Sequence, residues 1–158
     1  TFSLHVGVRT FEAAATLRRL GAQTENVKRL FASTMNEYLY RSHLVSEAKV
    51  HQGCAVAFSD KVPPEYEVVA PQAANELLGI DGVDASFVGI KQSDVIRLSA
   101  RSMGDVNVQL IMEKMGGGGH LTMAGAQLSG TSMEQAAQLL HEAIDTYMQE
   151  RAKEMAQK

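Results

Sequence analysis

The stretch GGGGHLTMAG, residues 116–125, lies between an amphipathic helical pattern and a short apolar strand pattern. Four residues without Cβ let the backbone adopt positive φ and let another group approach its N–H donors closely. The histidine that ends the run adds a donor that can carry charge near neutral pH. Together these features predict a small anion-binding pocket built mostly from main chain. The alternative is a flexible connection between helix and strand, although such linkers normally contain serine or other polar residues.

The composition is typical of a soluble globular protein of one domain, to which a helical arm can be added. The chain has 158 residues, of which 45% are apolar and 21% charged. Its formal net charge of −3 disfavours a partner such as long nucleic acid, whose binders usually show a basic stripe. Cys54 is the only cysteine and alternates with apolar residues, so we expect a buried thiol, no internal disulfide and a reducing compartment.

The first 48 residues show helical patterns without a sheet of their own. Phe2, Leu4 and Val6 alternate and predict a short extended segment before them. A first helix is expected to begin at Thr10, and a second, long helix to run from Thr24 to about Ala48. The pattern predicts an N-terminal helical arm, which starts at Thr1 without a methionine and is typical of an excised piece of a longer chain.

Residues 49–158 alternate between strand and helix patterns. Strands are expected at 50–58, 86–90, 95–101 and 124–128, and helices near Pro71, after Asp105 and after Thr131. Thr131 with Glu134 three residues on matches a capping box at the start of the last helix. The fold class predicted is α/β, with a mixed four- to five-stranded sheet flanked by helices and preceded by the helical arm.

Polar side chains on the third expected strand are candidates for anion contact. Alternation places Arg97, Ser99 and Arg101 on one face of this strand, opposite its apolar residues. The Arg101 guanidinium can fork onto a phosphate, or it can pair with a surface carboxylate. Asn107, in the first turn of the next helix, can serve a nucleobase with both donor and acceptor, or it can bond its own backbone.

Standard catalytic motifs do not fit the chain. The glycine run has no Lys-Ser/Thr ending, and it follows a helix instead of a strand, which excludes a P-loop and a dinucleotide fingerprint. No histidines and carboxylates have helical ligand spacing, and no nucleophile sits in a recognisable turn. We therefore expect neither a catalytic residue nor a metal or other cofactor in this chain, whose polar groups are suited to hold an anion.

The glycine-histidine run resembles the signature of the C-terminal domain of DHH-type phosphoesterases. The stretches IDGVDASFV (residues 80–88) and SARSMGDVNVQLIMEKMGGGG (99–119) make the chain similar to GdpP-type cyclic-di-AMP phosphodiesterases more than to the exonuclease and oligoribonuclease branches. Residues 2–11 also resemble the segment that closes the catalytic DHH domain in that group. The resemblance implies that residues 1–48 are the linker from the end of that domain, and that 49–158 form the DHH-associated substrate-binding domain.

The same resemblance implies which residues bind and which chemistry lies elsewhere. In the family, an N-terminal domain holds two manganese ions through aspartates and histidines, including an Asp-His-His triplet that this sequence does not contain. The residues implied to bind substrate are Gly117, Gly118, Gly119 and His120, with Ser99, Arg101 and Asn107 as weaker candidates on the same wall.

The resulting expectation is a fragment of a manganese-dependent phosphodiesterase that hydrolyses cyclic-di-AMP to linear pApA. Its expected partners are cyclic-di-AMP, the parent's DHH domain and a second copy of the chain, in a cytoplasmic location under a membrane-anchored parent. The alternative is an RNA- or single-strand-binding module of a DHH-type exonuclease or oligoribonuclease, which the nine aromatics and acidic balance disfavour. A third alternative is an interaction domain whose glycine loop only connects elements.

Overall fold

The computed structural model describes residues 6–156, which divide into two compact units. The first unit ends at Met35 and the second begins at Asn36. The extended segment expected around residues 2–6 lies outside the described residues, apart from Val6, which belongs to no strand. Among residues 6–156, no helix combines the length and the apolar character that crossing a membrane would require.

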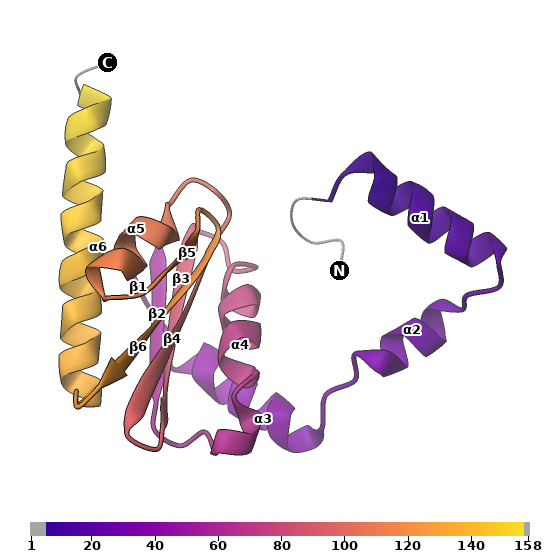
Figure 1. Ribbon diagram of the computed structural model, residues 1–158, viewed down its shortest axis with the longest axis horizontal. Helices are drawn as coiled ribbons and strands as arrows, with labels where there is room; N and C mark the ends of the chain where they lie inside the picture. The colour runs from indigo at the N-terminus through magenta and orange to yellow at the C-terminus, as the bar shows by residue number, and fades with distance from the viewer. Residues whose placement is uncertain (1–5, 157–158) are drawn as a thin grey trace. The chain divides into compact units, whose positions relative to one another are not determined.

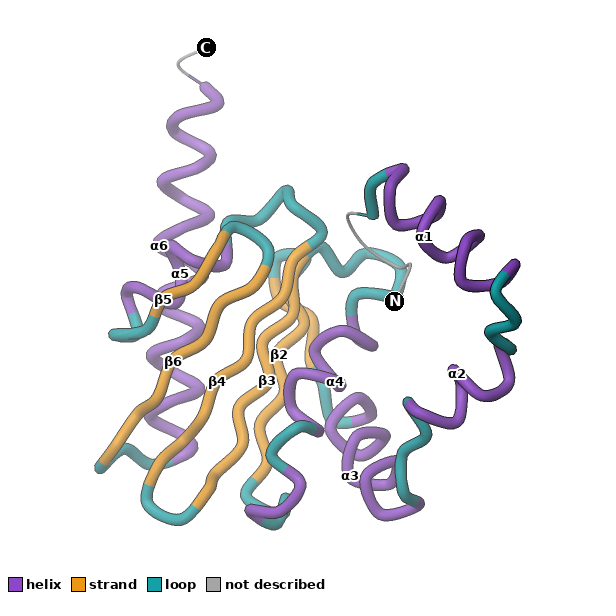
Figure 2. Tube along the Cα trace, turned by 45° about the vertical axis from the view of Figure 1, so that its right-hand side comes forward, coloured by secondary structure: helices purple, strands orange, loops and turns teal. Residues whose placement is uncertain are grey.

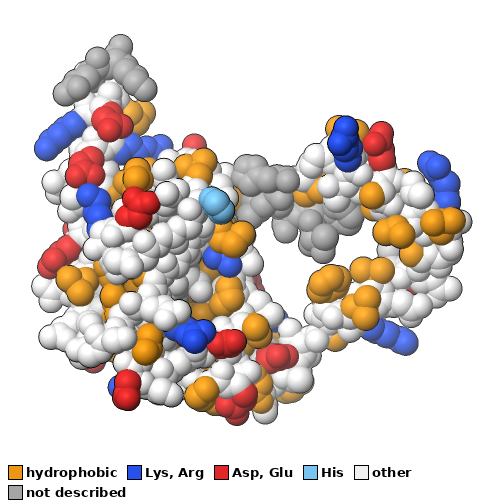
Figure 3. Space-filling model, viewed as in Figure 1, with side chains coloured by type: hydrophobic (Ala, Val, Ile, Leu, Met, Phe, Trp, Pro, Cys, Tyr) orange, Lys and Arg blue, Asp and Glu red, His pale blue; other side chains and the backbone are white. Residues whose placement is uncertain are grey.

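The first unit consists of two short helices, α1 (Val8–Arg19) and α2 (Thr24–Leu30), and neither buries a residue. The helix expected from Thr10 begins two residues earlier, because the backbone N–H of Thr10 donates to the Gly7 carbonyl. Apolar side chains lie exposed along this unit, as the orange atoms in Figure 3 show. They are Val8, Phe11, Leu17, Leu20, Val27, Leu30 and Phe31.

The single long helix expected from Thr24 to Ala48 is wrong, because the chain leaves helical geometry after Leu30. A new helix, α3 (Met35–Ser46), begins after Ser33 and Thr34. These residue types favour caps and turns over helix interiors, since their side chains compete for backbone hydrogen bonds. Leu44 of α3 is fully buried in the core of the second unit, so the arm expected to reach residue 48 ends instead near Met35.

The second unit is built on a mixed sheet of six strands in the order β1-β2-β3-β4-β6-β5 (Figure 2). Only β2 and β3 pair in parallel, and the other four pairs are antiparallel. The strands are β1 (Lys49–His51), β2 (Cys54–Ser59), β3 (Ala85–Gln92), β4 (Val95–Ser102), β5 (Gly118–His120) and β6 (Met123–Ser129). The α/β class and the mixed sheet are confirmed, with one strand more than the upper number expected.

Two features of the sheet differ from the expectation. The strand expected over 50–58 is a hairpin, because Gln52 and Gly53 both have positive φ (50° and 75°), as a tight two-residue turn requires. The second half of the glycine run, expected to form an anion-binding bend and not a strand, is the edge strand β5. Glycine has little strand propensity, so the local sequence pattern does not predict this strand.

Helices cover both faces of the sheet, as Figure 1 shows. On one face, α3 and α4 (Val69–Leu77) pack through Leu44, Leu77, Val88 and Ile90. A short 3-10 helix, η1 (Pro64–Tyr66), precedes α4. On the other face, α5 (Val108–Lys114) and α6 (Met133–Ala156) close a second core. Its largest fully buried members are Phe87, Ile111, Met112, Leu140 and Ile144.

Both helix caps expected in the second half are displaced in sequence. Asn107, and not Asp105, caps α5, because its side-chain oxygen accepts from the Gln109 backbone N–H at 3.1 Å. The capping box of α6 is formed by Ser132 and Gln135, one residue beyond the expected pair. Each backbone N–H of this box donates to the other residue's side chain, at 3.0 and 3.2 Å.

The buried position of Leu44 predicts that α3 contributes to the stability of the sheet unit. We expect Leu44→Ala to lower the free energy of unfolding by about 2–5 kcal/mol, because it leaves a cavity in a close-packed core. Leu39→Ala is the matched control on the same helix, since Leu39 is 56% exposed and should cost less than about 0.5 kcal/mol. Denaturant unfolding measures both, and equal effects would show that α3 does not belong to this core.

Cys54 is confirmed as a core residue and predicts a pH effect. Burial, with a smaller contribution from Asp84, raises the pKa of its thiol from 9.0 to about 12. The unfolded thiol ionises first, so we expect folding stability to fall as the pH rises from about 9 toward 12. Iodoacetamide near pH 9 should label the unfolded protein much faster than the native one. Equal labelling rates would contradict a buried thiol.

Candidate functional site

The polar residues of β4 lie on the sheet face that α4 partly covers. Leu98 and Ala100 point into the core with α5 and α6, so Arg97, Ser99 and Arg101 point to the opposite face. Helix α4 lies against β3 and β4, so the part of this face formed by β6 and β5 extends beyond the helix. The alternation expected from the sequence is confirmed.

Strand register aligns the predicted residues in two cross-strand rows. The Arg101 row runs Ser86, Arg101, Met123, His120, and the Ser99 row runs Val88, Ser99, Gly125, Gly118. Residues directly opposite each other share a face, and neighbouring strands are about 4.8 Å apart. Arg101 and His120 therefore have backbones about 10 Å apart on one face, with β6 between them.

Three of the four consecutive glycines are required by the fold. Gly116 has φ +73° and ends α5, where the N–H groups of Gly116 and Gly117 bond back to carbonyls of that helix. A Cβ on Gly117 would collide with Gly125 and Ala126, and a Cβ on Gly119 would collide with Met123 and Ala124. These glycines let β5 approach β6 more closely than any side chain permits.

Gly118 is the one glycine of the run that the fold does not require. Its φ lies outside the positive range, and a Cβ placed on it meets no atom within 4 Å. It belongs to the Ser99 row, beside Gly125, so the missing side chains leave a shallow floor on this face. A close approach to the backbone is therefore open at Gly118, as an anion-binding role requires.

Arg101 has no carboxylate partner among residues 6–156, so the surface ion pair considered from the sequence is not formed. Its Nη1 donates to the Ala100 carbonyl at 2.8 Å, and burial lowers the pKa of the half-buried guanidinium. His120 is exposed and bonds to no described side chain. The Arg101 row therefore carries two donors, Arg101 and His120, that remain available to an anion.

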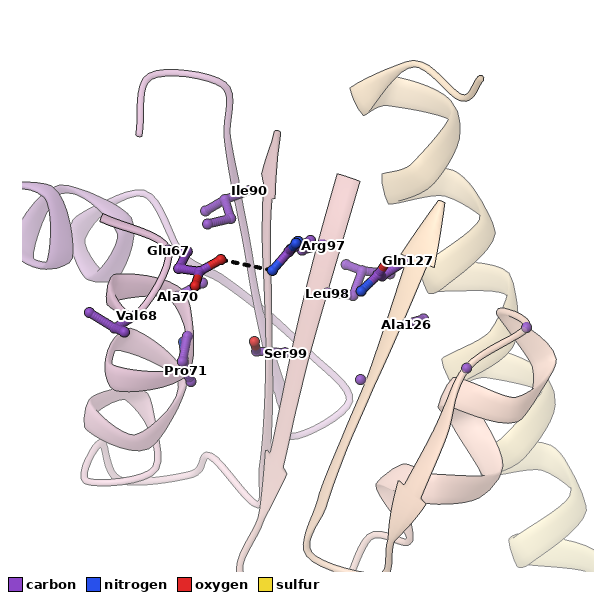
Figure 4. Close-up of a pocket in the computed structure, with 13 residues that line it drawn as sticks. Glu67, Val68, Ala70, Pro71, Ile90, Arg97, Leu98, Ser99, Ala126 and Gln127 are labelled. Atoms are coloured by element: carbon purple, nitrogen blue, oxygen red, sulfur yellow. Dashed lines mark hydrogen bonds and ion pairs between the residues drawn. The ribbon is translucent and has the colours of Figure 1, made fainter. Parts of the chain in front are cut away.

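A hollow of about 550 Å³ adjoins the Ser99 row; we call it the Arg97 hollow. Figure 4 shows Pro71, in the first turn of α4, on the side of the helix toward Ser99, and the ion pair between Arg97 and Glu67, whose length is 2.8 Å. The hollow is lined by Glu67, Val68, Ala70, Pro71, Ile90, Arg97, Leu98, Ser99, Gly116, Gly117, Gly125, Ala126 and Gln127.

The structure unites most, but not all, of the predicted residues. Ser99 and Gly117 line the Arg97 hollow, while Gly118, His120 and Arg101 extend the same face beyond it. Asn107 is not brought to this face. Its side chain caps α5 and its backbone N–H donates to the Tyr147 hydroxyl at 2.8 Å, in a hollow on α5 and α6.

Gln127 and Glu67 are polar residues of the hollow that were missed from the sequence. Gln127 follows Gly125 by two positions on β6, so strand alternation carried a signal for its place on this face. Glu67 carried none, because it precedes α4 and meets Arg97 across 30 positions of sequence.

The donors on this face suit an anion and do not fit a manganese site. Among residues 6–156, no three His, Cys, Asp or Glu side chains gather closely enough to hold a metal ion. Guanidinium and hydroxyl groups donate hydrogen bonds, whereas manganese prefers carboxylate and carbonyl oxygens. The site can therefore bind and orient an anion with its own groups.

Comparisons with known proteins show which family this fold belongs to. The chain is 45% identical over 151 residues to the cyclic-di-AMP phosphodiesterase GdpP of Geobacillus thermodenitrificans, which covers 94% of this chain and 23% of that relative. It is 43% identical over 148 residues to the cyclic-di-AMP phosphodiesterase PdeA of Listeria monocytogenes, covering 92% of this chain and 22% of the relative. The chain thus spans less than a quarter of the length of these relatives.

The fold is also similar to that of a solved exopolyphosphatase-related protein from Bacteroides fragilis. The two superpose with a TM-score of 0.76 at 20% identity, over 89% of this chain and 44% of the other. Residues 56–150 match the DHHA1 domain family, a span that contains the rows, the Arg97 hollow and the glycine run. The chain therefore belongs to the DHHA1 domain family.

Proposed function

We propose that this chain is the substrate-binding domain of a manganese-dependent phosphodiesterase that hydrolyses cyclic-di-AMP to linear pApA. The observation that carries the proposal is the placement of Gly118, a glycine the fold does not need, on one face with Arg101 and His120. The names of the relatives support cyclic-di-AMP as the substrate.

Each group on the face has a distinct part in holding the phosphodiester. The Arg101 guanidinium presents a planar fork that matches two phosphate oxygens. The Ser99 hydroxyl, which bonds to no described side chain, donates one further hydrogen bond. His120 donates from the far end of the Arg101 row, and the bare backbone at Gly118 lets the phosphate lie close to the sheet.

The manganese ions implied by the resemblance belong to the parent enzyme, and the described residues do not fit them. The part proposed for this chain is therefore binding and orientation of the phosphodiester, and the chain alone is expected to be inactive. We further propose that the parent's DHH domain, or a second copy of this chain, covers the apolar residues exposed on α1 and α2. We propose a cytoplasmic location on the basis of the resemblance to GdpP-type enzymes.

The open space at Gly118 predicts a variant that impairs binding and leaves the fold intact. In the parent enzyme, we expect Gly118→Ala to raise KM for cyclic-di-AMP about tenfold, which corresponds to about 1.4 kcal/mol, because the methyl group lifts the phosphate from the backbone. The unfolding temperature should not change, since no atom lies within 4 Å of the added Cβ.

Gly7→Ala is the matched control, because Gly7 also has open space and no positive φ. It should change neither KM nor stability, whereas Gly117→Ala should destabilise the domain through its collision with β6. A normal KM for the Gly118→Ala enzyme would remove the principal support for the proposed function.

The position of Arg101 predicts a second variant with impaired activity, for a different chemical reason. We expect Arg101→Ala to lower kcat/KM about 10- to 100-fold, because a charge-assisted hydrogen bond contributes about 1.5–3 kcal/mol. Arg101→Lys should recover only part of this loss, since an ammonium lacks the planar fork. Lys91→Ala, at an exposed position of β3, is the control for lost positive charge. Equal kinetics for the Arg101→Ala and Lys91→Ala enzymes would assign Arg101 a purely structural role.

A further inference from the structure

We propose that the Arg97 hollow is a nucleobase subsite that prefers adenine, with Gln127 as the residue that contacts the base edge. This inference rests on the proposed function, because it gives the nucleotide held by the Arg101 and Ser99 rows a place for its base. It concerns residues that the sequence pattern alone did not select for binding, namely Gln127 and Glu67.

The charge of the hollow favours a neutral group over a second phosphate. Arg97 Nη1 lies 2.8 Å from Glu67 Oε2, so the one cation in the lining is already paired with a carboxylate. A phosphate placed there would meet the negative charge of Glu67. Arg101, two positions beyond Ser99 on the same face, has no such partner among the described residues. The two arginines therefore divide this face into an anion-binding row and a neutral hollow.

The walls of the hollow suit a flat, mostly apolar ring. Val68 and Pro71 supply apolar surface at the start of α4, and Gly117 and Gly125 expose backbone on the other side. Such a combination of apolar walls with a few polar groups is typical of small-molecule sites. The volume of about 550 Å³ lies within the range of such sites.

The free polar groups of the lining match the edge of adenine. The Gln127 amide and the Ser99 hydroxyl have no hydrogen-bond partner among the described side chains. A glutamine amide can donate to N7 and accept from the N6 amino group of adenine. Guanine presents two acceptors at the same edge and is best met by an arginine fork. Arg97 would supply that fork, but its guanidinium already donates a hydrogen bond to the Glu67 carboxylate.

The spacing along β4 agrees with a single nucleotide spanning the two regions. Ser99 and Arg97 are two residues apart on one face, which corresponds to about 7 Å along a strand. Ser99 belongs both to the Ser99 row and to the lining of the hollow. A phosphate bound at the Arg101 and Ser99 rows thus directs the attached base toward Gln127. Gln127 lies directly opposite Arg97 on the neighbouring strand.

The experiment compares three ligands by isothermal titration of the parent enzyme: AMP, ribose 5-phosphate and GMP. AMP and ribose 5-phosphate share phosphate and sugar, so the ratio of their affinities isolates the base. We expect AMP to bind at least about tenfold more tightly than ribose 5-phosphate, and GMP to bind more weakly than AMP. Gln127→Ala should abolish the higher affinity for AMP and leave the affinity for ribose 5-phosphate unchanged. Gln127→Glu should have the same two effects, and its side chain of nearly the same shape preserves the fold.

Glu67→Gln tests the other half of the inference. Released from its carboxylate, Arg97 becomes available to guanine, so the affinity ratio of GMP to AMP should rise at least about threefold. Glu65→Gln, an exposed neighbour in η1, is the matched control and should leave the ratio unchanged.

The outcomes separate this inference from the proposed function. Equal affinity for AMP and ribose 5-phosphate in the unmodified enzyme overturns the proposed base subsite. An equal loss of affinity for both ligands in the Gln127 variants also overturns it. Hydrolysis of cyclic-di-AMP is measured on the same proteins. Absent hydrolysis with the AMP preference intact overturns the proposed function alone, whereas normal hydrolysis without that preference overturns the subsite alone.

Discussion

The close approach of β5 to β6 is the constraint on which the rest of the site depends. Gly117 and Gly119 pack so tightly against residues 123–126 that a single methyl group on either would collide with the neighbouring strand. This contact makes a strand of a glycine run that has no intrinsic preference for one. It also fixes the register that aligns His120 with Met123 and, through it, with Arg101. The placement of the groups proposed to bind phosphate is thus a consequence of backbone packing.

The distribution of charge on the same face gives the site its second property. Arg97 and Arg101 point in the same direction from one strand, yet within residues 6–156 a carboxylate pairs with Arg97 and none pairs with Arg101. Arg101 is half-buried, and its one hydrogen bond to the described residues goes to its own strand, so its charge is only partly hydrated and these residues do not compensate it. An anion that reaches it replaces lost hydration, which is the condition under which an arginine fork binds phosphate best. The paired arginine, by contrast, shapes the neighbouring hollow.

The sequence was sufficient for the features that depend on local periodicity. Strict alternation from Ile96 to Ala100 predicted the face of β4 correctly, because one side of that strand is buried and a shift of one residue would expose its apolar set. The break between α2 and α3 was missed, because the helical spacing of apolar residues continues across Ser33 and Thr34. The backbone itself leaves helical geometry there. Strand β5 was missed because glycines carry no pattern, and its pairing arises from contacts with β6.

The candidate site was predictable only in part, for the same reason. Gly117, Gly118 and His120 stand in one short run, whereas Arg101 joins them only through register with β6. Asn107 illustrates the limit of local inference, because a helix cap and a ligand contact need the same residue type at the same place. Glu67 was beyond prediction, since its partner lies 30 residues away across the sheet.

A crystal structure of the parent enzyme with linear pApA bound tests the central claim most directly. The account predicts a phosphate oxygen within about 2.9 Å of the Arg101 guanidinium, above the bare backbone at Gly118 and on the face that carries His120. A phosphate bound elsewhere, with Arg101 and Gly118 free of ligand, would contradict it.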